Sequence, residues 1–346
     1  MQMRDRKISS VIMAAGRGTR MPSSNVNKVC LPLAGKPAIT RIIETLYECG
    51  IQSHFVVLGH SSQSVLQSVS NAPGTHHFCY QKEPKGTGNA AKIAAALIQD
   101  NPSIDDVLVI AGDTFIEKGI LQEFVRGYLD SSGDLSFIVK ESDNLKTLGH
   151  VVYDDSGNIT GIAEAPDIAR MKFLLRLKED TAVKSLTSEE CVRIAGEYFH
   201  DESKTLKVLG NFWKSVKSGG PVTKELLAGS FTENDFLLKV NNRRLRPESL
   251  SKIKYANLSV YLFRRESFLF SLEKINSDNA QKEEYITDTV AILAENNRKI
   301  TLLPVNNFRQ VMTYNTPEEI AEIERLLILY SDAVDICPRY NAKYYS

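Results

Sequence analysis

The alternation of strand and helix signals in the first half of the chain is the strongest constraint on its fold. The apolar run Ile8–Ala15 ends at Gly16, as a buried strand ends before a turn. Short apolar runs and stretches of helical periodicity then follow one another up to position 139. This order predicts an α/β fold, in which a mostly parallel sheet has helices on both faces.

Turn and capping signals bound these elements. Pro37 stands where a first helical turn begins, and Gly50 stands where that helix ends. We expect strands at Ile8–Ala15, His54–Leu58, Phe78–Gln81, Val107–Gly112 and Leu135–Val139. We expect helices at Pro37–Cys49, Ser62–Val69, Thr87–Gln99 and Ile120–Tyr128. Because right-handed crossovers bring the carboxyl ends of parallel strands to one edge, ligands should bind in the segments after the strands, Gly16–Lys28, Gln81–Gly88 and Gly112–Thr114.

The second half of the chain breaks the alternation. A hairpin is expected at Gly149–Asp155 and Ile159–Ala165, and residues 166–254 then read as mainly helical. Apolar residues such as Phe173 and Trp213 favour an inserted, packed subdomain over a long solvated lid. Further elements follow at Ala256–Phe263, Glu266–Ile275, Thr287–Glu295, Ile300–Val305, Arg309–Thr313 and Pro317–Tyr330. We therefore divide the chain into one domain of residues 1–165 and 255–346 and an inserted subdomain of residues 166–254.

Charge and cysteine content exclude several classes of protein. The chain has 42 basic and 42 acidic side chains, a balance that argues against a coat for nucleic acid or anionic membranes. It has no apolar stretch long enough to span a bilayer, and the short charged segment before Ile8 lacks the core of a signal peptide. The five cysteines form no C-x-x-C pair. We expect a cytoplasmic protein with reduced thiols and no nucleic-acid or membrane partner; a homo-oligomer stays open.

A glycine-containing segment directly after the first strand is the clearest sign of a ligand site. Positions 14–21 read AAGRGTRM, and Lys28 follows. Glycines in this place let backbone N–H groups approach phosphate oxygens, and Arg20 and Lys28 add positive charge. The segment predicts a polyphosphate site, and the alternative is a tight turn beside unrelated cations.

Two common nucleotide motifs are absent from this segment. A dinucleotide fingerprint has glycine where Met21 stands, and the second strand ends in Leu58-Gly59-His60 without the acidic residue that binds a ribose. The Walker A pattern is also missing. The sequence therefore excludes the NAD-binding and P-loop classes by motif.

Polar residues follow two other expected strands. Asp113 ends the apolar run before it, where a carboxylate is a suitable ligand for Mg²⁺. Gln81 is followed by KGTGNA at positions 85–90, so a side-chain amide lies beside glycines that open a helix. Such an amide can read the edge of a base. The alternatives are a turn aspartate and an ordinary helix entry.

In their order along the chain, these motifs resemble those of the sugar-1-phosphate nucleotidyltransferases, and most of all the uridylyltransferase domain of the N-acetylglucosamine-1-phosphate uridylyltransferases. The shared patterns are A-A-G-x-G-T-R-M, K-x(3)-P-L-A-G-K-P, Q-x(4)-G-T-G-x-A and G-D. Later landmarks are Gly149, Asp155–Glu164, Asn257, Gln281–Asp288 and Asn315. The resemblance covers nearly the whole chain except residues 166–254. It implies a Rossmann-like sheet of the GT-A kind.

The resemblance also implies roles for individual residues. The nucleotide would be bound by Ala14, Ala15, Gly16, Gly18, Thr19, Gln81, Gly86 and Thr87. Arg20 and Lys28 would act on the phosphates at the reacting centre, and Asp113 and Asn315 would bind Mg²⁺. The sugar would be held by Gly149, Glu164, Asn257, Tyr285 and Thr287.

The sequence departs from the family pattern around the base and the sugar. Thr114 replaces a proline, Pro84 stands where the uridylyltransferases tend to have a second glutamine, and the other changes are at Lys282, Glu284 and Leu258–Ser259. The long insertion between Glu164 and Asn257 adds to these changes. The phosphate-binding residues are intact. The identity of both substrates is therefore open.

The implied reaction joins a nucleoside triphosphate, UTP as the first expectation, to N-acetylglucosamine-1-phosphate or a related hexose-1-phosphate, with release of pyrophosphate. One alternative keeps this chemistry with CTP, GTP or dTTP and an unusual phosphorylated acceptor. The other is a regulatory subunit that binds a nucleotide-sugar without catalysis. The relatives also carry a C-terminal β-helix with acetyltransferase activity. Its hexapeptide repeats are not found before Ser346, so we expect that second activity to be absent.

Overall fold

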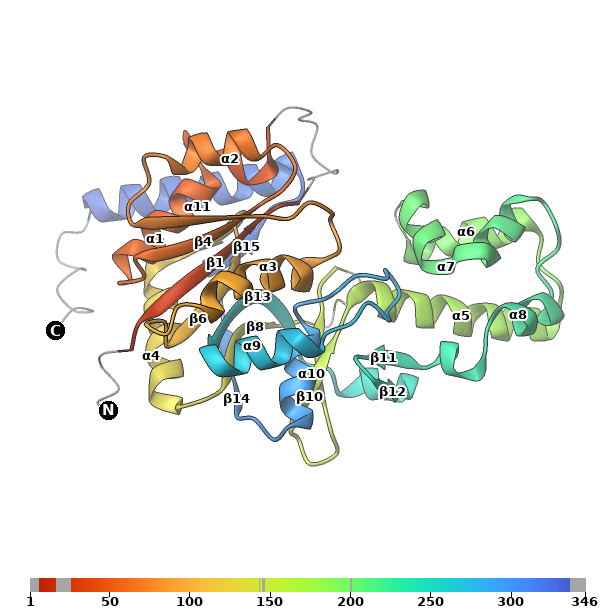
Figure 1. Cartoon of the computed structure of the whole chain (residues 1–346). Helices are drawn as coiled ribbons and strands as arrows, with labels where there is room; N and C mark the ends of the chain where they lie inside the picture. The colour runs from red at the N-terminus through yellow and green to blue at the C-terminus, as the bar shows by residue number, and fades with distance from the viewer. Residues whose placement is uncertain (1–5, 17–25, 143, 145–146, 200, 337–346) are drawn as a thin grey trace.

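A computed structural model describes residues 6–16, 26–142, 144, 147–199 and 201–336 of the chain (Figure 1). In this part of the chain, the central sheet has nine strands. They are β1 (Ile8–Ala14), β4 (Ser53–Leu58), β5 (Thr75–Tyr80), β6 (Asp106–Ala111), β8 (Leu135–Glu141), β9 (His150–Tyr153), β10 (Ile159–Ala163), β13 (Tyr255–Arg264) and β14 (Ile300–Val305).

The sheet is mostly parallel. β5, β4, β1 and β6 are parallel neighbours in that order, and β14 runs parallel to β8. β13 lies antiparallel between β6 and β8 and also pairs with β9, which forms an antiparallel hairpin with β10. The predicted fold class is confirmed. Because β6 and β8 are both antiparallel to β13, all six strands β5, β4, β1, β6, β8 and β14 point the same way.

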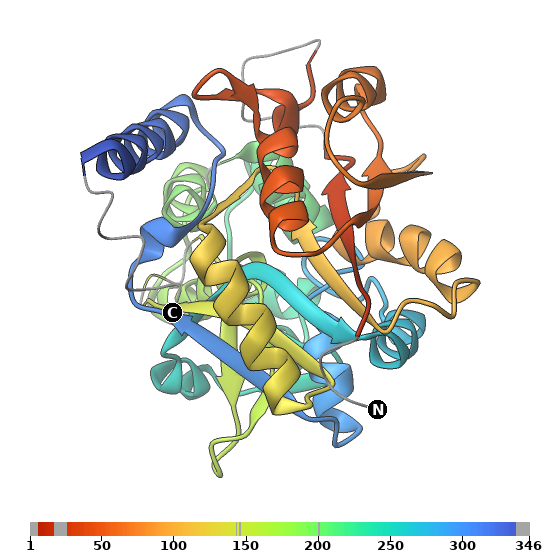
Figure 2. The same cartoon turned by 90° about the vertical axis from the view of Figure 1, so that its left-hand side faces the viewer.

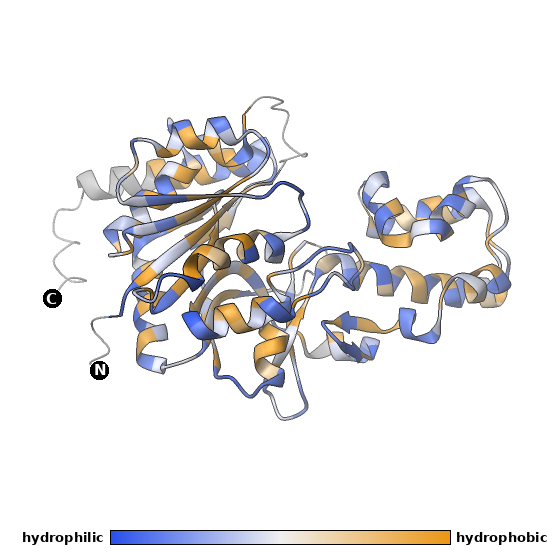
Figure 3. Ribbon diagram, viewed as in Figure 1, coloured by the Kyte–Doolittle hydropathy of each residue, from blue (hydrophilic) through white to orange (hydrophobic). Residues whose placement is uncertain are grey.

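Helices cover both faces of the sheet because its strands are apolar on both sides. On β1, Val11 belongs to one buried cluster and Ile12 to the other. The first face is covered by α3 (Thr87–Gln99), α9 (Arg265–Lys274) and α10 (Asp288–Glu295), and the second by α1 (Ala38–Glu48), α2 (Ser62–Val69) and α4 (Lys118–Ser131). Figure 2 shows yellow α4 crossing in front of the strands, and Figure 3 shows the apolar colour of the strands between the two layers.

The insertion forms a hydrophobic cluster of its own. Its helices are α5 (Ala165–Val183), α6 (Ser188–Tyr198), α7 (Glu202–Lys217) and α8 (Lys224–Ser230), and they extend away from the sheet (Figure 1). Phe173, Phe212 and Trp213 are buried in their shared core. This separate core supports the division of the chain at residues 166–254, which stays a prediction.

The insertion also contains a hairpin that the sequence did not predict. β11 (Leu238–Val240) and β12 (Arg243–Leu245) are antiparallel, between the 3₁₀ turns Glu233–Phe236 and Pro247–Lys252. Leu238 and Val240 pack with Ile168 and with Ala291 of α10. The hairpin therefore returns to the body of the protein, whereas the helices extend outward.

The C-terminal segment closes back on the carboxyl edge of the sheet. β15 (Val311–Thr313) pairs with β7 (Thr114–Ile116), and α11 (Pro317–Ile336) packs near the short pair β2 (Pro32–Leu33) and β3 (Lys36–Pro37). The strand predicted from Arg309 begins at Val311, because Phe308–Gln310 form a 3₁₀ turn. Pairing of β15 with β7 places Asn315 near Asp113. Among the described helices, none is long and apolar enough to cross a membrane.

The packing between α4 and the sheet gives a test of the fold. Phe124 of α4 is 1% exposed within the second apolar layer. Phe124→Ala should lower the free energy of unfolding by about 3–5 kcal/mol, because it removes a buried ring and leaves a cavity. Urea denaturation measures this change. The matched control is Phe78→Ala on edge strand β5, where the ring is 42% exposed and the loss should be much smaller; equal losses would contradict the packing.

Candidate active site

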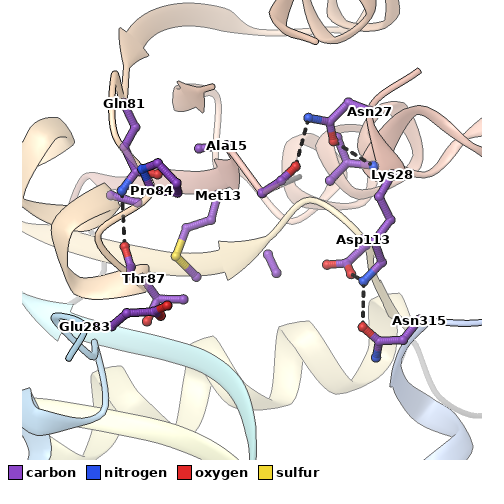
Figure 4. Close-up of a pocket in the computed structure, with 15 residues that line it drawn as sticks. Met13, Ala15, Asn27, Lys28, Gln81, Pro84, Thr87, Asp113, Glu283 and Asn315 are labelled. Carbon is purple, nitrogen blue, oxygen red and sulfur yellow. Dashed lines mark hydrogen bonds and ion pairs between the residues drawn. The ribbon is translucent and has the colours of Figure 1, made fainter. Parts of the chain in front are cut away.

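A cavity of about 360 Å³ opens at the carboxyl edge of the sheet, where β1, β5 and β6 end. Figure 4 shows Gln81, Pro84 and Thr87 on one side of Met13 and Lys28, Asp113 and Asn315 on the other. Predicted site residues that line it are Ala15, Gly16, Lys28, Gln81, Gly86, Thr87, Asp113 and Asn315. Residues far apart in the sequence thus line one cavity. It lies at the edge of the sheet where the sequence analysis predicts that a ligand binds.

The Lys28 ammonium joins two of these segments. Its Nζ donates a hydrogen bond to Asn315 Oδ1 at 3.0 Å and forms an ion pair with Asp113 (Figure 4). The Tyr314 hydroxyl donates to the Lys28 carbonyl at 2.6 Å, and the Tyr314 ring centroid lies 5.3 Å from Nζ. Burial raises the pKa of Tyr314, and the nearby Asp113 carboxylate adds to the rise. Tyr314 therefore stays a neutral donor that fixes the lysine backbone.

The donor set suits a hard divalent cation. The oxygens of Asp113 and Asn315 both contact one ammonium, so they are close enough to share a cation. Mg²⁺ prefers oxygen ligands and usually takes one or two from the protein, with waters and phosphate oxygens completing its shell. Among the residues described, no group of three or more His, Cys, Asp or Glu side chains could hold a metal. A Mg²⁺ bound here would therefore complete its shell with oxygens of water or of a phosphate.

A buried asparagine that the sequence analysis missed holds the glycine segment. Asn27 is 2% exposed, and its Nδ2 donates to the carbonyls of Ala14 at 3.0 Å, Gly16 at 3.4 Å and His60 at 2.7 Å. Ala14 is buried and is not among the residues that line the cavity, so its predicted contact with a nucleotide stays a prediction. No local motif marks Asn27, because its partners lie in other segments. Gly18, Thr19 and Arg20 lie outside the described residues, so their roles stay predictions.

Gln81 is held at the opposite side of the cavity. Its Nε2 donates to the Gly86 carbonyl at 3.2 Å and to Asn89 Oδ1 at 3.0 Å. Gly86 has a φ of +110°, and a Cβ there would lie 2.4 Å from the Glu284 carbonyl oxygen. Only glycine fits both the backbone conformation and this approach. The loop that carries Gly86 is thus fixed against the segment that carries Glu283–Ile286.

The predicted sugar residues also come together. Thr287 Oγ1 donates to Glu164 Oε1 at 2.5 Å, and the backbone N–H of Asn257 donates to the Gly149 carbonyl at 2.8 Å. A Cβ at Gly149 would lie 3.4 Å from both Glu164 carboxylate oxygens. None of the five predicted sugar residues is among those that line a second cavity of about 600 Å³. Their sequence neighbours Leu148, Ala165 and Leu258 line it, and it shares Asn315 with the first cavity. Tyr285 is 7% exposed, and its hydroxyl donates to Gln281 Oε1 at 3.3 Å.

Beside Glu164 lies a buried acidic cluster that the sequence did not predict. Burial raises the pKa of Asp167 to about 7, although the hydrogen bond that its carboxylate accepts from the Ala280 N–H acts to lower this pKa. Burial, together with Glu164 and Asp167, raises the pKa of Asp288 to about 7. Burial also raises the pKa of Glu164, and the hydrogen bond from Thr287 opposes that rise. The only sequence signal is spacing, since Asp167 follows Glu164 by three residues and Asp288 follows Thr287.

This cluster predicts a pH dependence of stability. Between about pH 4, where an unfolded aspartate titrates, and about pH 7, the folded protein holds protons on Asp167 and Asp288 that the unfolded chain releases. Stability should therefore fall as pH rises through this window, by about 1.4 kcal/mol for each unit of pKa rise. Asp288→Asn should flatten the fall, as measured by urea midpoints at pH 5, 6, 7 and 8.

The control for this experiment is Asp130→Asn. Asp130 is exposed on α4, and the substitution should leave the wild-type slope unchanged. Equal slopes for the wild type and Asp288→Asn would contradict the raised pKa of Asp288.

Known proteins resemble the chain over most of its length. The chain is 23% identical over 322 residues to the bifunctional protein GlmU of Heliobacterium modesticaldum, which covers 93% of the chain and 52% of that protein. It is 22% identical over 319 residues to bifunctional GlmU of a Geobacillus species, covering 92% and 51%. The chain therefore spans about half the length of these curated relatives.

Solved structures share the fold. A putative glucose-1-phosphate thymidylyltransferase from Bacillus anthracis, in complex with a sucrose, superposes with a TM-score of 0.58 at 15% identity, covering 92% of this chain and 94% of that one. HddC from Yersinia pseudotuberculosis superposes with a TM-score of 0.51 at 16% identity, covering 92% and 99%. The model of the nucleotidyl transferase family matches residues 9–307. The chain therefore belongs to the nucleotidyl transferase family, and its resemblance to the sugar-1-phosphate nucleotidyltransferases is confirmed.

Proposed function

We propose that this protein couples a nucleoside triphosphate, with UTP as the first candidate, to a sugar-1-phosphate and releases pyrophosphate. N-acetylglucosamine-1-phosphate or a related hexose-1-phosphate is the first candidate for the acceptor. One observation carries the proposal: the cluster of Lys28, Asp113 and Asn315 lies where the two cavities meet, since Asn315 lines both. A nucleotide in the first cavity and an acceptor in the second would bring their phosphates to this cluster.

The residue types fit the chemistry. An oxygen of the sugar phosphate attacks the α-phosphorus, a new P–O bond forms, and the bond from the α-phosphorus to the bridging oxygen breaks as pyrophosphate leaves. The nucleophile is already an anion, so the step needs no general base. Its cost is repulsion between two polyanions, which Lys28 and Arg20 would offset. Catalysis would therefore depend on positioning and charge stabilisation.

Asp113 and Asn315 would hold Mg²⁺ in this proposal. The ion would supply positive charge to neutralise the triphosphate and the leaving pyrophosphate. The Lys28 ammonium contacts the side-chain oxygens of both Asp113 and Asn315. When metal and nucleotide bind, this ammonium would turn to a phosphate oxygen. Asp113 would then keep a cation beside it, and the phosphates of the nucleotide would balance the added positive charge.

The identity of the nucleotide base is less constrained than the reaction itself. Gln81 and Gly86 line the first cavity and offer hydrogen-bonding groups to a base edge, and Pro84 lies beside them (Figure 4). The named relatives differ: one solved structure is a putative thymidylyltransferase, and another HddC structure holds GMP-PN, with a TM-score of 0.50. GTP and dTTP are therefore alternatives to UTP, and CTP remains a further alternative. A regulatory subunit without catalysis is disfavoured, because binding alone would not require the paired Lys28, Asp113 and Asn315.

The experiment is a pyrophosphate-release assay with Mg²⁺. It crosses UTP, CTP, dTTP, ATP and GTP with N-acetylglucosamine-1-phosphate, glucose-1-phosphate and other sugar phosphates. Release that needs one nucleotide and one sugar phosphate together supports the proposal and identifies both substrates. Absence of release across the grid, in a folded protein that binds a nucleotide, would favour the regulatory alternative.

Asp113→Asn tests the proposed metal ligand. The substitution removes the charge and keeps the shape, and kcat should fall about 10²–10³-fold, because a group that stabilises charge at the reacting centre is lost. The melting temperature should fall, because the ion pair with Lys28 is lost, but the fold should survive, as circular dichroism at the assay temperature checks. Asp100→Asn, at an exposed position after α3, is the matched control and should keep full activity. Turnover near the wild-type rate in Asp113→Asn would contradict the assignment.

A further inference from the structure

The second cavity is larger than the proposed nucleotide cavity. Its volume is about 600 Å³, against about 360 Å³ for the first. A cavity of this size lies within the range of about 300–1,000 Å³ that accepts drug-sized ligands, which are larger than one hexose ring. The body of the protein supplies one wall, at Leu258 and Val311–Thr313, and the insertion supplies another.

The wall from the insertion is aromatic. Tyr198 ends α6 and Phe199 follows it, and both rings are half-buried and line the cavity. Phe173 of α5 packs edge-on against both, with centroid separations of 6.0 Å to Tyr198 and 5.5 Å to Phe199. Phe173 is fully buried, and Tyr198 and Phe199 pack against the hydrophobic cluster to which it belongs. The cavity thus has an aromatic surface, backed by a packed core, of the kind that binds the face of a ring.

Contacts with the body hold this wall in place. Lys207 of α7 pairs with Glu283 at 2.5 Å, and Glu283 lines the nucleotide cavity. The Asp167 carboxylate of α5 accepts a hydrogen bond from the Ala280 N–H at 2.9 Å. Ala280 is also part of the hydrophobic cluster of the insertion. The insertion is therefore docked on the segment between α9 and α10, and its aromatic wall keeps a set position relative to both cavities.

The acidic side chains of the cavity already have partners. Glu319 accepts hydrogen bonds from the backbone N–H groups of Asn315 and Thr316, as a cap at the start of α11. Glu322 pairs with Arg309 at 3.8 Å. These two carboxylates therefore serve the C-terminal segment. The exposed cation Lys204 lies at the opposite wall, so the cavity does not repel an anionic acceptor.

From these observations we infer that the second cavity binds the acceptor and selects a glycosyl phosphate longer than one hexose, with Tyr198 and Phe199 as specificity-determining residues. The inference rests on the proposed function. The acceptor phosphate would lie at Asn315, and the carbohydrate beyond the first ring would lie against the two aromatic rings. The insertion therefore acts as part of the acceptor site.

The first test compares acceptors in the wild-type enzyme. Glucose-1-phosphate and maltose-1-phosphate differ by one glucose unit, and each is assayed with the nucleotide that gives the highest turnover. We expect kcat/KM for maltose-1-phosphate to equal or exceed that for glucose-1-phosphate. A kcat/KM for the disaccharide below that for glucose-1-phosphate would overturn the inference, while turnover of the hexose phosphate would keep the proposed function. No turnover of any acceptor would overturn both.

The second test uses Tyr198→Ala and Phe199→Ala with the preferred acceptor. Each should raise the KM for the acceptor about tenfold and leave the KM for the nucleotide unchanged, because a stacking surface is lost on one side only. Tyr198→Leu keeps apolar bulk and tests whether an aromatic ring is needed. This variant is also the safeguard in case the alanine variants fail to fold, and the melting temperature of each variant reports its folding. Tyr47→Ala, on exposed α1, is the matched control. Unchanged acceptor KM in folded Tyr198 and Phe199 variants would overturn the inference.

Discussion

The rest of the site depends on the contacts that the Lys28 side chain makes with Asp113 and Asn315. These residues come from three separate segments: a turn after β1, the end of β6 and the residues before α11. The Lys28 side chain is only 14% exposed, and a charge shielded from water to this extent is destabilising without a partner of opposite charge. Folding therefore has to bring the C-terminal segment to the sheet edge, and the pairing of β15 with β7 does so. The contacts of Lys28 therefore both hold these segments together and balance the charge of its ammonium.

Much of the fold could be predicted because its elements have strong local signals. The helices at Ser62–Val69 and Thr87–Gln99 have the predicted bounds, since glycine and serine turns and apolar periodicity mark them. The hairpin of β11 and β12 was missed because each strand is three residues long. Among the site residues, the cations Arg20 and Lys28 and the glycines after the first strand could be recognised from the sequence. The proximity of Lys28 and Asn315, 287 residues apart, depends on tertiary structure and came only from the family resemblance.

Asn27 and the acidic cluster show why the remainder could not be predicted. Asn27 acts through three carbonyls of other segments, so neither its neighbours nor its type distinguishes it. Asp167 and Asp288 acquire raised pKa values only when folding removes water from around them. Such residues are determined by burial and distance. A single sequence carries neither quantity directly.

The strand pairing of His150, on β9, shows how the sheet accommodates the insertion. Ala163, where the chain leaves the sheet, and Ala256, soon after it returns, both pair with His150 from opposite sides. The two ends of the insertion are therefore about two strand spacings apart, roughly 10 Å. A loop with fixed, neighbouring ends can grow at a cost that rises only with the logarithm of its length. The insertion, and with it one wall of the second cavity, can thus change through evolution while the sheet and the edge that carries Lys28 and Asp113 stay unchanged.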